Sequence, residues 1–357
     1  MINFRITLRQ RRITLKVLNC HMRIFMLITC LLGLVPLGVP RAFADQAPGQ
    51  VSAELRYFGT CDGSAVVQIG EHVLLTANDE DNILRSYHLL GGKPLGQFDI
   101  SLLAGVDSNE EIDIEGVARQ GDLLWWIGSH GLGKKGIEGD DKPARRNIFA
   151  TNIPGPGLEN LKLVEKHTNL TDALRNSEDL KEILTPEVWN LAPKKGGLNI
   201  EGVVFAPNGD LLVGLRSPLF AKKGKKGRAL IVHLRKAGDG WSVVDVSRLK
   251  LDDRGIRDIH TVDGGYLMIA GEVHSGGKSA LYFWNGTDKP ELRSVDGIQN
   301  LNPEAVIQFD GHQIIFSDDG TRDRKPDFFE AEQECGEFYD PEQSHPLVYF
   351  RAVVVNP

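Results

Sequence analysis

Glu201-Gly-Val-Val-Phe-Ala-Pro-Asn-Gly-Asp-Leu-Leu-Val-Gly-Leu-Arg216 is a sequence typical of a tight β-hairpin. Its two apolar runs flank Asn208-Gly209, and such dipeptides supply the positive φ angles that a two-residue hairpin turn requires. The same arrangement of apolar stretch, turn and second apolar stretch ending in polar residues occurs five times. The copies begin at Ser64, Glu115, Glu201, Arg257 and Glu304. Repetition of one supersecondary unit predicts a repeat architecture.

Two further strand-like runs follow most copies, such as Ala229 to Arg235 and Trp241 to Leu249 after the third. Four strands per unit, repeated at intervals of roughly 50–60 residues, indicate the blades of a β-propeller. We therefore expect an all-β fold with a single propeller of five four-stranded blades. The longer interval between the second and third copies contains residues 171–191, which have helical periodicity and Thr171 as a candidate N-cap. We expect a short helical insertion there; the alternative is a sixth blade.

The last copy contains only three strands of its own, so a fourth must come from elsewhere in the chain. Val51 to Phe58 can supply it, and this closure pairs the sheet edges that would otherwise be exposed. The same closure brings Cys61 and Cys335 to one junction, and two lone cysteines in an oxidising compartment can pair. We expect a Cys61–Cys335 disulfide; the alternative is two separate buried thiols.

The N-terminal segment, residues 1–44, has the pattern of a signal peptide. It contains seven basic side chains and no acidic one, then the apolar run Phe25 to Val39, and it ends in Ala42-Phe43-Ala44. An apolar run of roughly 15 residues is short for a membrane span, which needs about 20. We expect cleavage after Ala44, with Met22 as an alternative start, and a propeller domain of residues 45–357 in the periplasm or outside the cell. No later segment is apolar enough to predict a stable membrane span.

The charge of the predicted mature chain excludes some partners. Without the seven basic residues of the signal peptide, 34 basic side chains face 48 acidic ones, a formal charge of about −14. Nucleic acids and anionic membranes bind clustered Lys and Arg, so we expect no nucleic-acid partner.

Polar residues recur at the start of the first strand and the end of the second strand of each hairpin. These two positions lie at the same end of a hairpin, and the innermost strands of a propeller line its channel. One channel mouth should therefore collect these side chains. They are Ser64, Glu115, Glu201, Arg257 and Glu304 from first strands, and residues 78–81, Ser129, His130, Arg216, Glu272, Asp318 and Asp319 from second strands.

So many carboxylates need neighbouring cations, because they repel one another and raise each other's pKa. One interpretation is structural: the pairs Glu201–Arg216 and Glu272–Arg257 hold the blades, and water fills the channel. The surplus of carboxylates instead suits a hard cation such as Ca²⁺, which takes six to eight oxygen ligands. The candidate metal ligands are Asp79, Glu115, Glu201, Glu304 and Asp318. The chain lacks a glycine-rich phosphate loop, and we expect no organic cofactor.

Arginines at the same mouth make an anionic small molecule a candidate ligand. Arg216 and Arg257 could clamp the anion beside a metal, and Arg145 and Arg146 begin the next strand along the rim. A second basic loop, Lys222 to Arg228, follows Arg216. His130 and Glu115 are the candidate catalytic groups, with His130 as general acid or base; the alternative for His130 is a hydrogen-bonded structural role.

Several motifs are specific enough to compare with known families. They are Cys61-Asp-Gly-Ser-Ala, Ala77-Asn-Asp-Glu-Asp-Asn-Ile-Leu-Arg85, Glu111-Ile-Asp-Ile-Glu-Gly, Trp126-Ile-Gly-Ser-His-Gly131, Asn199-Ile-Glu-Gly, Gly214-Leu-Arg-Ser-Pro218 and Ser317-Asp-Asp-Gly320. Together they resemble the domain of unknown function 3616 family of exported β-propeller proteins, over nearly the whole mature chain. This resemblance implies no established activity. The Ile-Glu-Gly motif is also similar to phytase-like and esterase-like propellers, which implies phosphoester hydrolysis.

Two functions follow as hypotheses. The first is an exported propeller that binds a divalent cation and hydrolyses or binds a phosphorylated small molecule at the channel mouth, as a metal-dependent phosphoester or ester hydrolase. The alternative is a non-catalytic propeller that binds a ligand or another protein of the cell envelope through the same face.

Overall fold

The computed structural model describes residues 47–137, 140–222, 224–274, 278–324, 333–340 and 345–356. The predicted signal peptide, residues 1–44, lies outside this part of the chain. All of the described residues belong to one compact unit, Phe43–Pro357.

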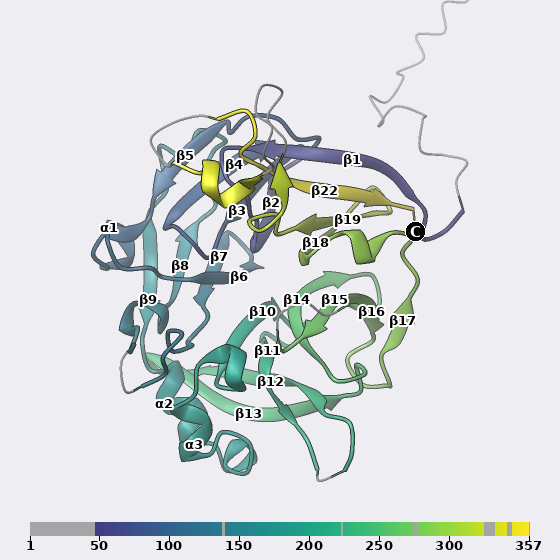
Figure 1. Cartoon of the computed structure of the whole chain (residues 1–357). Helices are drawn as coiled ribbons and strands as arrows, with labels where there is room; N and C mark the ends of the chain where they lie inside the picture. The colour runs from purple at the N-terminus through teal and green to yellow at the C-terminus, as the bar shows by residue number, and fades with distance from the viewer. Residues whose placement is uncertain are drawn as a thin grey trace, which may run out of the picture. The chain divides into compact units, whose positions relative to one another are not determined.

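The unit is an all-β propeller of five four-stranded antiparallel sheets (Figure 1). The first blade contains β2 (Ala65–Gly70), β3 (Val73–Ala77), β4 (Ile83–His88) and β5 (Gly96–Asp99). The second contains β6 (Ile114–Gln120), β7 (Leu123–Gly128), β8 (Ile148–Asn152) and β9 (Leu163–His167). The third contains β10 (Asn199–Phe205), β11 (Leu211–Phe220), β12 (Arg228–Ala237) and β13 (Gly240–Leu249). The fourth contains β14 (Arg254–Val262), β15 (Gly265–Glu272), β16 (Ala280–Trp284) and β17 (Glu291–Arg293). The prediction of five blades is confirmed.

The fifth blade is built from both ends of the unit. Its order is β1-β22-β19-β18, with β1 (Val51–Phe58) at the outer edge, then β22 (Tyr349–Val355), β19 (His312–Ser317) and β18 (Pro303–Phe309). β1 runs antiparallel to β22, from the pair Val51–Val355 to the pair Phe58–Tyr349. This is the predicted closure, in which the N-terminal strand completes the last sheet.

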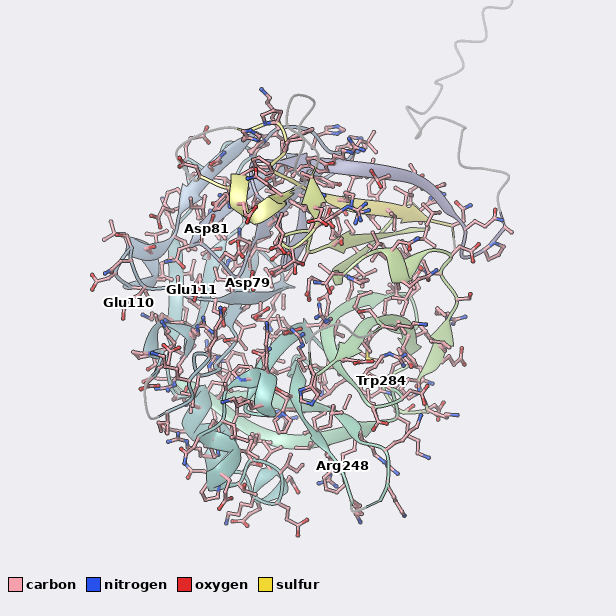
Figure 2. All side chains as sticks on the ribbon, in the orientation of Figure 1. Asp79, Asp81, Glu110, Glu111, Arg248 and Trp284 are labelled. Atoms are coloured by element: carbon pink, nitrogen blue, oxygen red, sulfur yellow. A yellow bond between two sulfur atoms is a disulfide. The ribbon has the colours of Figure 1, made fainter. Side chains whose placement is uncertain are left out.

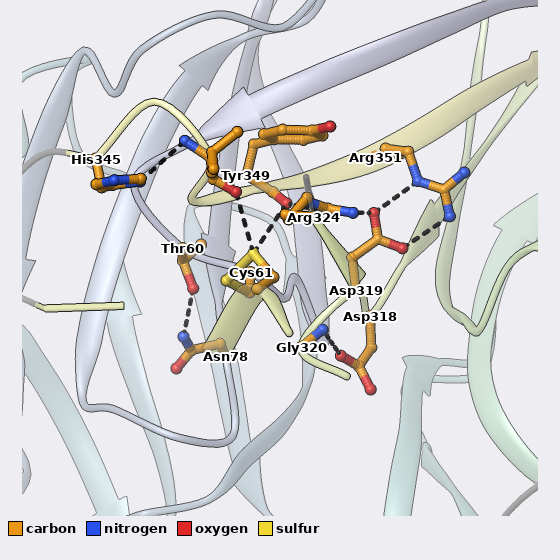
Figure 3. The surroundings of a disulfide bond; sticks show 12 residues. Thr60, Cys61, Asn78, Asp318, Asp319, Gly320, Arg324, His345, Tyr349 and Arg351 are labelled. Carbon is orange, nitrogen blue, oxygen red and sulfur yellow. Dashed lines mark hydrogen bonds and ion pairs between the residues drawn. A yellow bond between two sulfur atoms is a disulfide. The ribbon is translucent and has the colours of Figure 1, made fainter. Parts of the chain in front are cut away.

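The predicted disulfide between Cys61 and Cys335 is present beside this closure (Figure 3). Both cysteines are buried, and Val348 packs against them. Cys61 follows β1 directly, whereas Cys335 begins a 3-10 turn (Cys335–Phe338) after the two-residue strands β20 (Asp323–Arg324) and β21 (Gln333–Glu334). The bond therefore links the N-terminal strand to the segment that leads into β22.

The innermost strands β2, β6, β10, β14 and β18 form a closed ring, since each contacts its two neighbours. Five hydrophobic clusters of the described residues each combine side chains of two adjacent blades. Trp125 and Ile127 of the second blade, for example, pack with Val213 and Leu230 of the third. Complete burial of a side chain of this size contributes about 1.5–3 kcal/mol relative to exposure. The apolar contacts between blades thus stabilise the closed ring and position the ends of the innermost strands.

The insertion between β9 and β10 is helical but more broken than the sequence suggests. It consists of α2 (Leu170–Arg175), α3 (Pro186–Trp189) and short 3-10 turns. α2 begins at Leu170 after Asn169, so Thr171 lies inside the helix and is not its N-cap. Leu174, Leu180 and other apolar residues of the insertion pack onto the core of the second and third blades. One additional turn, α1 (Ser101–Ala104), links the first and second blades.

None of the helices in the described part of the chain has the length and apolar character that crossing a bilayer requires.

Candidate functional site

Four inner hairpins carry a β-bulge at the same place. The strand register shifts between Ile114 and Gly116, between Ile200 and Gly202, between Ile256 and Asp258, and between Pro303 and Ala305. The residues at the four shifts are Glu115, Glu201, Arg257 and Glu304. A bulge bends its strand and redirects a side chain, and bulges are common beside functional sites. The sequence predicts each of these charged residues at the channel mouth.

The centre of the acidic site is a cluster of Asp79, Asp113 and Glu115. One carboxylate oxygen of each lies within 4.8 Å of the others. Asp79 follows β3, whereas Asp113 and Glu115 lie at the start of β6, so the cluster joins the first and second blades. Asp113 has a positive φ of 57°, a conformation that Asp tolerates better than most residues. In Figure 2, Asp79 and Glu111 are labelled close to each other beside the inner strands.

Two further carboxylates lie behind this cluster. Asp62 is buried and accepts a hydrogen bond from Ser64 through Oδ2, whereas no N–H or hydroxyl group of the described residues donates to its Oδ1. Asp318 accepts hydrogen bonds of 2.7 Å from Asn302 Nδ2 and from the backbone N–H of Gly320. Burial, and then the charges of Asp318 and Asp79, hold the pKa of Asp62 well above its usual range. Burial also raises the pKa of Asp79, which the side chain of Asp62 lowers through a hydrogen bond and Asp318 raises.

The pKa values at the mouth reflect burial and mutual repulsion. Burial raises the pKa of Asp113 to about 7, although Arg145 opposes the shift. Burial and then Asp79 raise the pKa of Glu80 to about 7. The pKa of Glu115 lies well above its usual range because the carboxyl is buried and faces Glu201 and Asp113. The cationic side chains present therefore do not neutralise the carboxylates of this site.

An open cavity of about 580 Å³ gives access to the cluster. Its acidic lining is Asp79, Glu80, Glu111, Asp113, Glu115 and Asp140, and its basic lining is Lys134, Lys142, Arg145, Lys194, Lys195 and Arg216. Arg145 pairs with Glu111 and with Asp113, at 3.0 Å from Nη1 to Oδ2 of Asp113. The cavity is thus lined by acidic and basic side chains together.

The predicted ion pair between Glu201 and Arg216 is present, with Nη1 at 2.7 Å from Oε1. The pairing of Arg257 with Glu272 is not found. Arg257 instead pairs with Glu304 of the fifth blade, and Glu272 is exposed at the end of β15. Because the bulge turns Arg257 toward the neighbouring blade, its partner lies across the blade junction rather than across the hairpin.

His130 lies in a different cavity from the acidic cluster. It lines a small space with Leu132, Arg146, Trp189 and other residues, and its Nδ1 is 2.9 Å from the carbonyl oxygen of Gly128. Burial lowers the pKa of His130 to about 4. Its Nε2 is buried without a partner. Arg146 pairs with Asp141 near this second cavity, so of the two candidate arginines before β8 Arg145 alone lines the mouth cavity.

Asp319 and Asp81 bind arginines instead of joining the cluster. Asp319 accepts hydrogen bonds of 2.7 and 2.8 Å from Arg351 and one of 3.3 Å from Arg324, close to the disulfide (Figure 3). Asp81 pairs with Arg85 at 2.8 Å. Both carboxylates have cationic partners, and neither lines the mouth cavity.

Sequence reasoning missed Asp62, Glu111 and Asp113 as site residues. All three precede the inner strands, and the hairpin pattern covers only the strands themselves. The alternation of acidic residues in Glu111-Ile-Asp113-Ile-Glu115 was the available signal, because residues two apart in extended chain point the same way.

A family described as "Protein of unknown function (DUF3616)" matches residues 62–151 and 157–313 of the chain. No curated protein matches the chain significantly.

Solved structures with some likeness to the chain include three enzymes. Glutaminyl cyclase of Myxococcus xanthus is 10% identical, with 87% of this chain and 99% of that chain covered and a TM-score of 0.44. An α-L-arabinofuranosidase of Clostridium thermocellum is 14% identical, with 72% and 81% covered and a TM-score of 0.40. Virginiamycin B lyase from Staphylococcus aureus is 10% identical, with 85% and 99% covered and a TM-score of 0.35. Similarity at this level carries no argument about the activity of this chain.

Proposed function

Because the chain belongs to the DUF3616 family, whose description names no activity, we propose its function from the site: the channel mouth binds a divalent cation, with Ca²⁺ as the expected ion, and a phosphorylated small molecule beside it. The observation that carries the proposal is the grouping of Asp79, Asp113 and Glu115.

The spacing of these carboxylates suits one Ca²⁺ ion. Calcium binds oxygen at about 2.3–2.6 Å, so two ligand atoms on opposite sides of the ion are about 4.6–5.2 Å apart. Three oxygens within 4.8 Å of one another can therefore reach a single ion. The buried carboxyl group of Asp62 lies within hydrogen-bonding reach of Asp79, and a cation beside the two groups would relieve their mutual repulsion.

The remaining ligands predicted from the sequence have different surroundings. Glu201 and Glu304 each pair with an arginine, and we leave both out of the proposed coordination. Asp318 lies close to Asp62 and Asp79, and we keep it as an additional ligand or a neighbouring charge.

The basic side chains of the same cavity support an anionic ligand. Arg145 and Arg216 line the cavity beside the acidic side chains, together with Lys134, Lys194 and Lys195. An anion that lies between a metal ion and arginines is the usual arrangement for phosphate recognition. Arg257, buried and paired with Glu304, does not line this cavity and would act by orienting its neighbours.

Catalysis requires a proton-transfer group, and His130 lies in another cavity. Its low pKa keeps the imidazole neutral at neutral pH. The position of His130 outside the mouth cavity favours the non-catalytic alternative, in which the propeller binds its ligand without turnover. Hydrolysis by a metal-dependent route is the second form of the proposal, and Glu115 would then act as a metal ligand.

We also propose that the protein is exported to the periplasm or the exterior. The Cys61–Cys335 disulfide fits an oxidising compartment, in which such bonds form and persist. Another envelope protein is the partner expected for the non-catalytic form.

The test uses residues 45–357, phenylphosphonate as a non-hydrolysable probe and p-nitrophenyl phosphate as a substrate. The proposal predicts calorimetric binding of phenylphosphonate in the presence of Ca²⁺ and a loss of that binding with EDTA. Phosphonate binding without turnover of p-nitrophenyl phosphate would support the non-catalytic form, and Ca²⁺-dependent turnover the hydrolytic form. Binding that is the same with Ca²⁺ and with EDTA would contradict the shared metal–anion site.

A further inference from the structure

A second charged cavity lies on the third blade, between the end of β11, the loop that leads to β12, and the end of β13. Its volume is about 610 Å³. It is lined by Phe220, Lys222, Lys225, Lys226, Gly227, Arg228, Arg248, Lys250 and Asp252. None of these residues lines the mouth cavity. Figure 2 shows Arg248 on the β13 side of the propeller, well apart from Asp79 and Glu111.

Positive charge dominates this cavity, although acidic residues outnumber basic ones in the whole chain. Its lining contains six cationic side chains and one carboxylate. The carboxylate of Asp252 is 3.4 Å from Nζ of Lys226. Within the described part of the chain, no acidic side chain pairs with Lys222, Lys225, Arg228 or Lys250. Unpaired like charges this close repel one another, so a bound anion would neutralise the cationic side chains of the cavity.

Phe220 packs against two of the cationic side chains in the cavity wall. Phe220 lies under Arg248, with the guanidinium carbon 4.6 Å from the ring centroid, and Lys222 Nζ lies 5.9 Å from the same centroid. Such cation–π contacts fix a cation while leaving its hydrogen-bond donors free. One N–H of Arg248 also lies 3.4 Å from the carbonyl oxygen of Asp179.

Hydrogen bonds of backbone N–H groups also hold Lys225 and Gly227. The N–H of Lys225 donates to the carbonyl oxygen of Lys222 at 2.9 Å, and the N–H of Gly227 donates to the carboxylate of Asp253. Among the described residues, no ion pair engages the ammonium groups of Lys222, Lys225 or Lys250, so these three remain available for a ligand.

We infer that this cavity binds a small soluble anion with several closely spaced phosphate groups, independently of the channel mouth. Lysine and arginine are the side chains that recognise phosphate, lysine as a point charge and arginine through its planar fork. The volume lies within the range of about 300–1,000 Å³ that small-molecule sites occupy. A ligand with a single negative charge would leave most of the cations unmatched, which favours a polyanion over a lone carboxylate.

The experiment is an isothermal titration of residues 45–357 with inorganic tripolyphosphate in EDTA. EDTA removes divalent cations, so the result does not depend on the channel mouth. The test variant is the triple substitution Lys222→Ala, Lys225→Ala and Lys250→Ala. The control is the triple substitution Lys93→Ala, Lys162→Ala and Lys289→Ala, which removes the same charge from exposed sites on three other blades. All six lysines are exposed, so both proteins should fold as the wild type does.

We expect the cavity variant to bind tripolyphosphate at least about tenfold more weakly than the wild type, since about 1.4 kcal/mol corresponds to a factor of ten. The control should stay within about twofold, and wild-type affinity should fall as salt rises. Equal affinity in the two triple variants, or no binding by the wild type, would overturn the inference. Cosedimentation with phosphatidic acid vesicles without tripolyphosphate binding would also overturn it, because a membrane surface would then be the partner.

Discussion

Arg216 and Glu201 pair across the innermost hairpin of the third blade, with 2.7 Å between Nη1 and Oε1. The same Oε1 accepts a hydrogen bond of 2.7 Å from Asn199, whereas Oε2 is buried without a partner. Arg216 also reaches the fourth blade, where its Nε is 3.3 Å from the carbonyl oxygen of Glu272. This pair therefore neutralises a buried carboxylate beside the acidic cluster and joins two blades.

Replacement of Arg216 should destabilise the propeller strongly. Arg216→Met leaves Glu201 buried without its cation, and breaking a buried pair from one side costs about 3–5 kcal/mol. The double variant Glu201→Gln with Arg216→Met should recover much of that loss, because no charge is left uncompensated. Urea unfolding measures all three proteins. A loss below about 1 kcal/mol in Arg216→Met would show that the pair is not held in a desolvated environment.

Loss of the disulfide should weaken the closure of the ring. The double variant Cys61→Ala with Cys335→Ala removes a bond between residues 274 positions apart. We expect a decrease of about 2–4 kcal/mol in the free energy of unfolding, since a disulfide limits the freedom of the unfolded chain. The wild type in reducing agent should approach the variant, whereas the variant should not respond to reductant. A wild type that matches the variant before reduction would contradict this account.

Burial of His130 should make the protein less stable in acid. Its pKa of about 4 in the folded state lies below the value of about 6.5 in an unfolded chain. As the pH falls from 6.5 to 4, His130 binds a proton in the unfolded state but not in the folded state. This difference lowers the free energy of unfolding by up to about 3 kcal/mol.

His130→Asn tests this effect, because Asn does not titrate and tolerates the positive φ of 56° at this position. The variant should lose less stability between pH 7 and pH 4 than the wild type. Comparison of the two unfolding curves cancels the contributions of other groups. Parallel curves for the two proteins would contradict the predicted role of His130.

Close packing at the junction of the third and fourth blades depends on Gly255. A Cβ atom there would lie 1.9 Å from the carbonyl oxygen of Arg216. Gly255→Ala should cost about 1–3 kcal/mol, the usual range for overpacking, and should lower the thermal midpoint. The control is Gly70→Ala, where the new Cβ would meet its nearest neighbour at 3.6 Å. Equal midpoints for the two variants would show that the junction is looser than the structure indicates.

The sequence predicted the parts of the fold that depend on local patterns. Turn dipeptides such as Asn208-Gly209 locate the hairpins, and the three-strand last copy predicts closure by residues 51–58 and hence the Cys61–Cys335 bond. The turn dipeptide determines the register of a hairpin only where neither strand contains an inserted residue, so the bulges could not be predicted from it.

The predicted pairing of Arg257 with Glu272 and the predicted position of His130 at the mouth differ from the structure because of local backbone geometry. Arg257 faces Glu304 because its bulge turns it toward the next blade, and the angle between blades depends on the packing of the whole ring. His130 has a positive φ and leaves the line of β7, so its side chain points into a separate cavity. Sequence position alone therefore identified some residues of the mouth cavity, such as Asp79 and Glu115, but neither Asp113 nor the partner of Arg257.

Thermal unfolding of residues 45–357 with Ca²⁺ and with excess EDTA tests the proposed cation site most directly. A ligand that binds only the folded state stabilises it by about 2.7 kcal/mol at 100 times its Kd. We predict a midpoint several degrees higher in Ca²⁺ for the wild type and for Glu71→Gln, an exposed control in the β2–β3 turn. Glu115→Gln and Asp113→Asn should lose this shift. The absence of a shift in the wild type, or the same shift in all four proteins, would contradict a cation site at Asp79, Asp113 and Glu115.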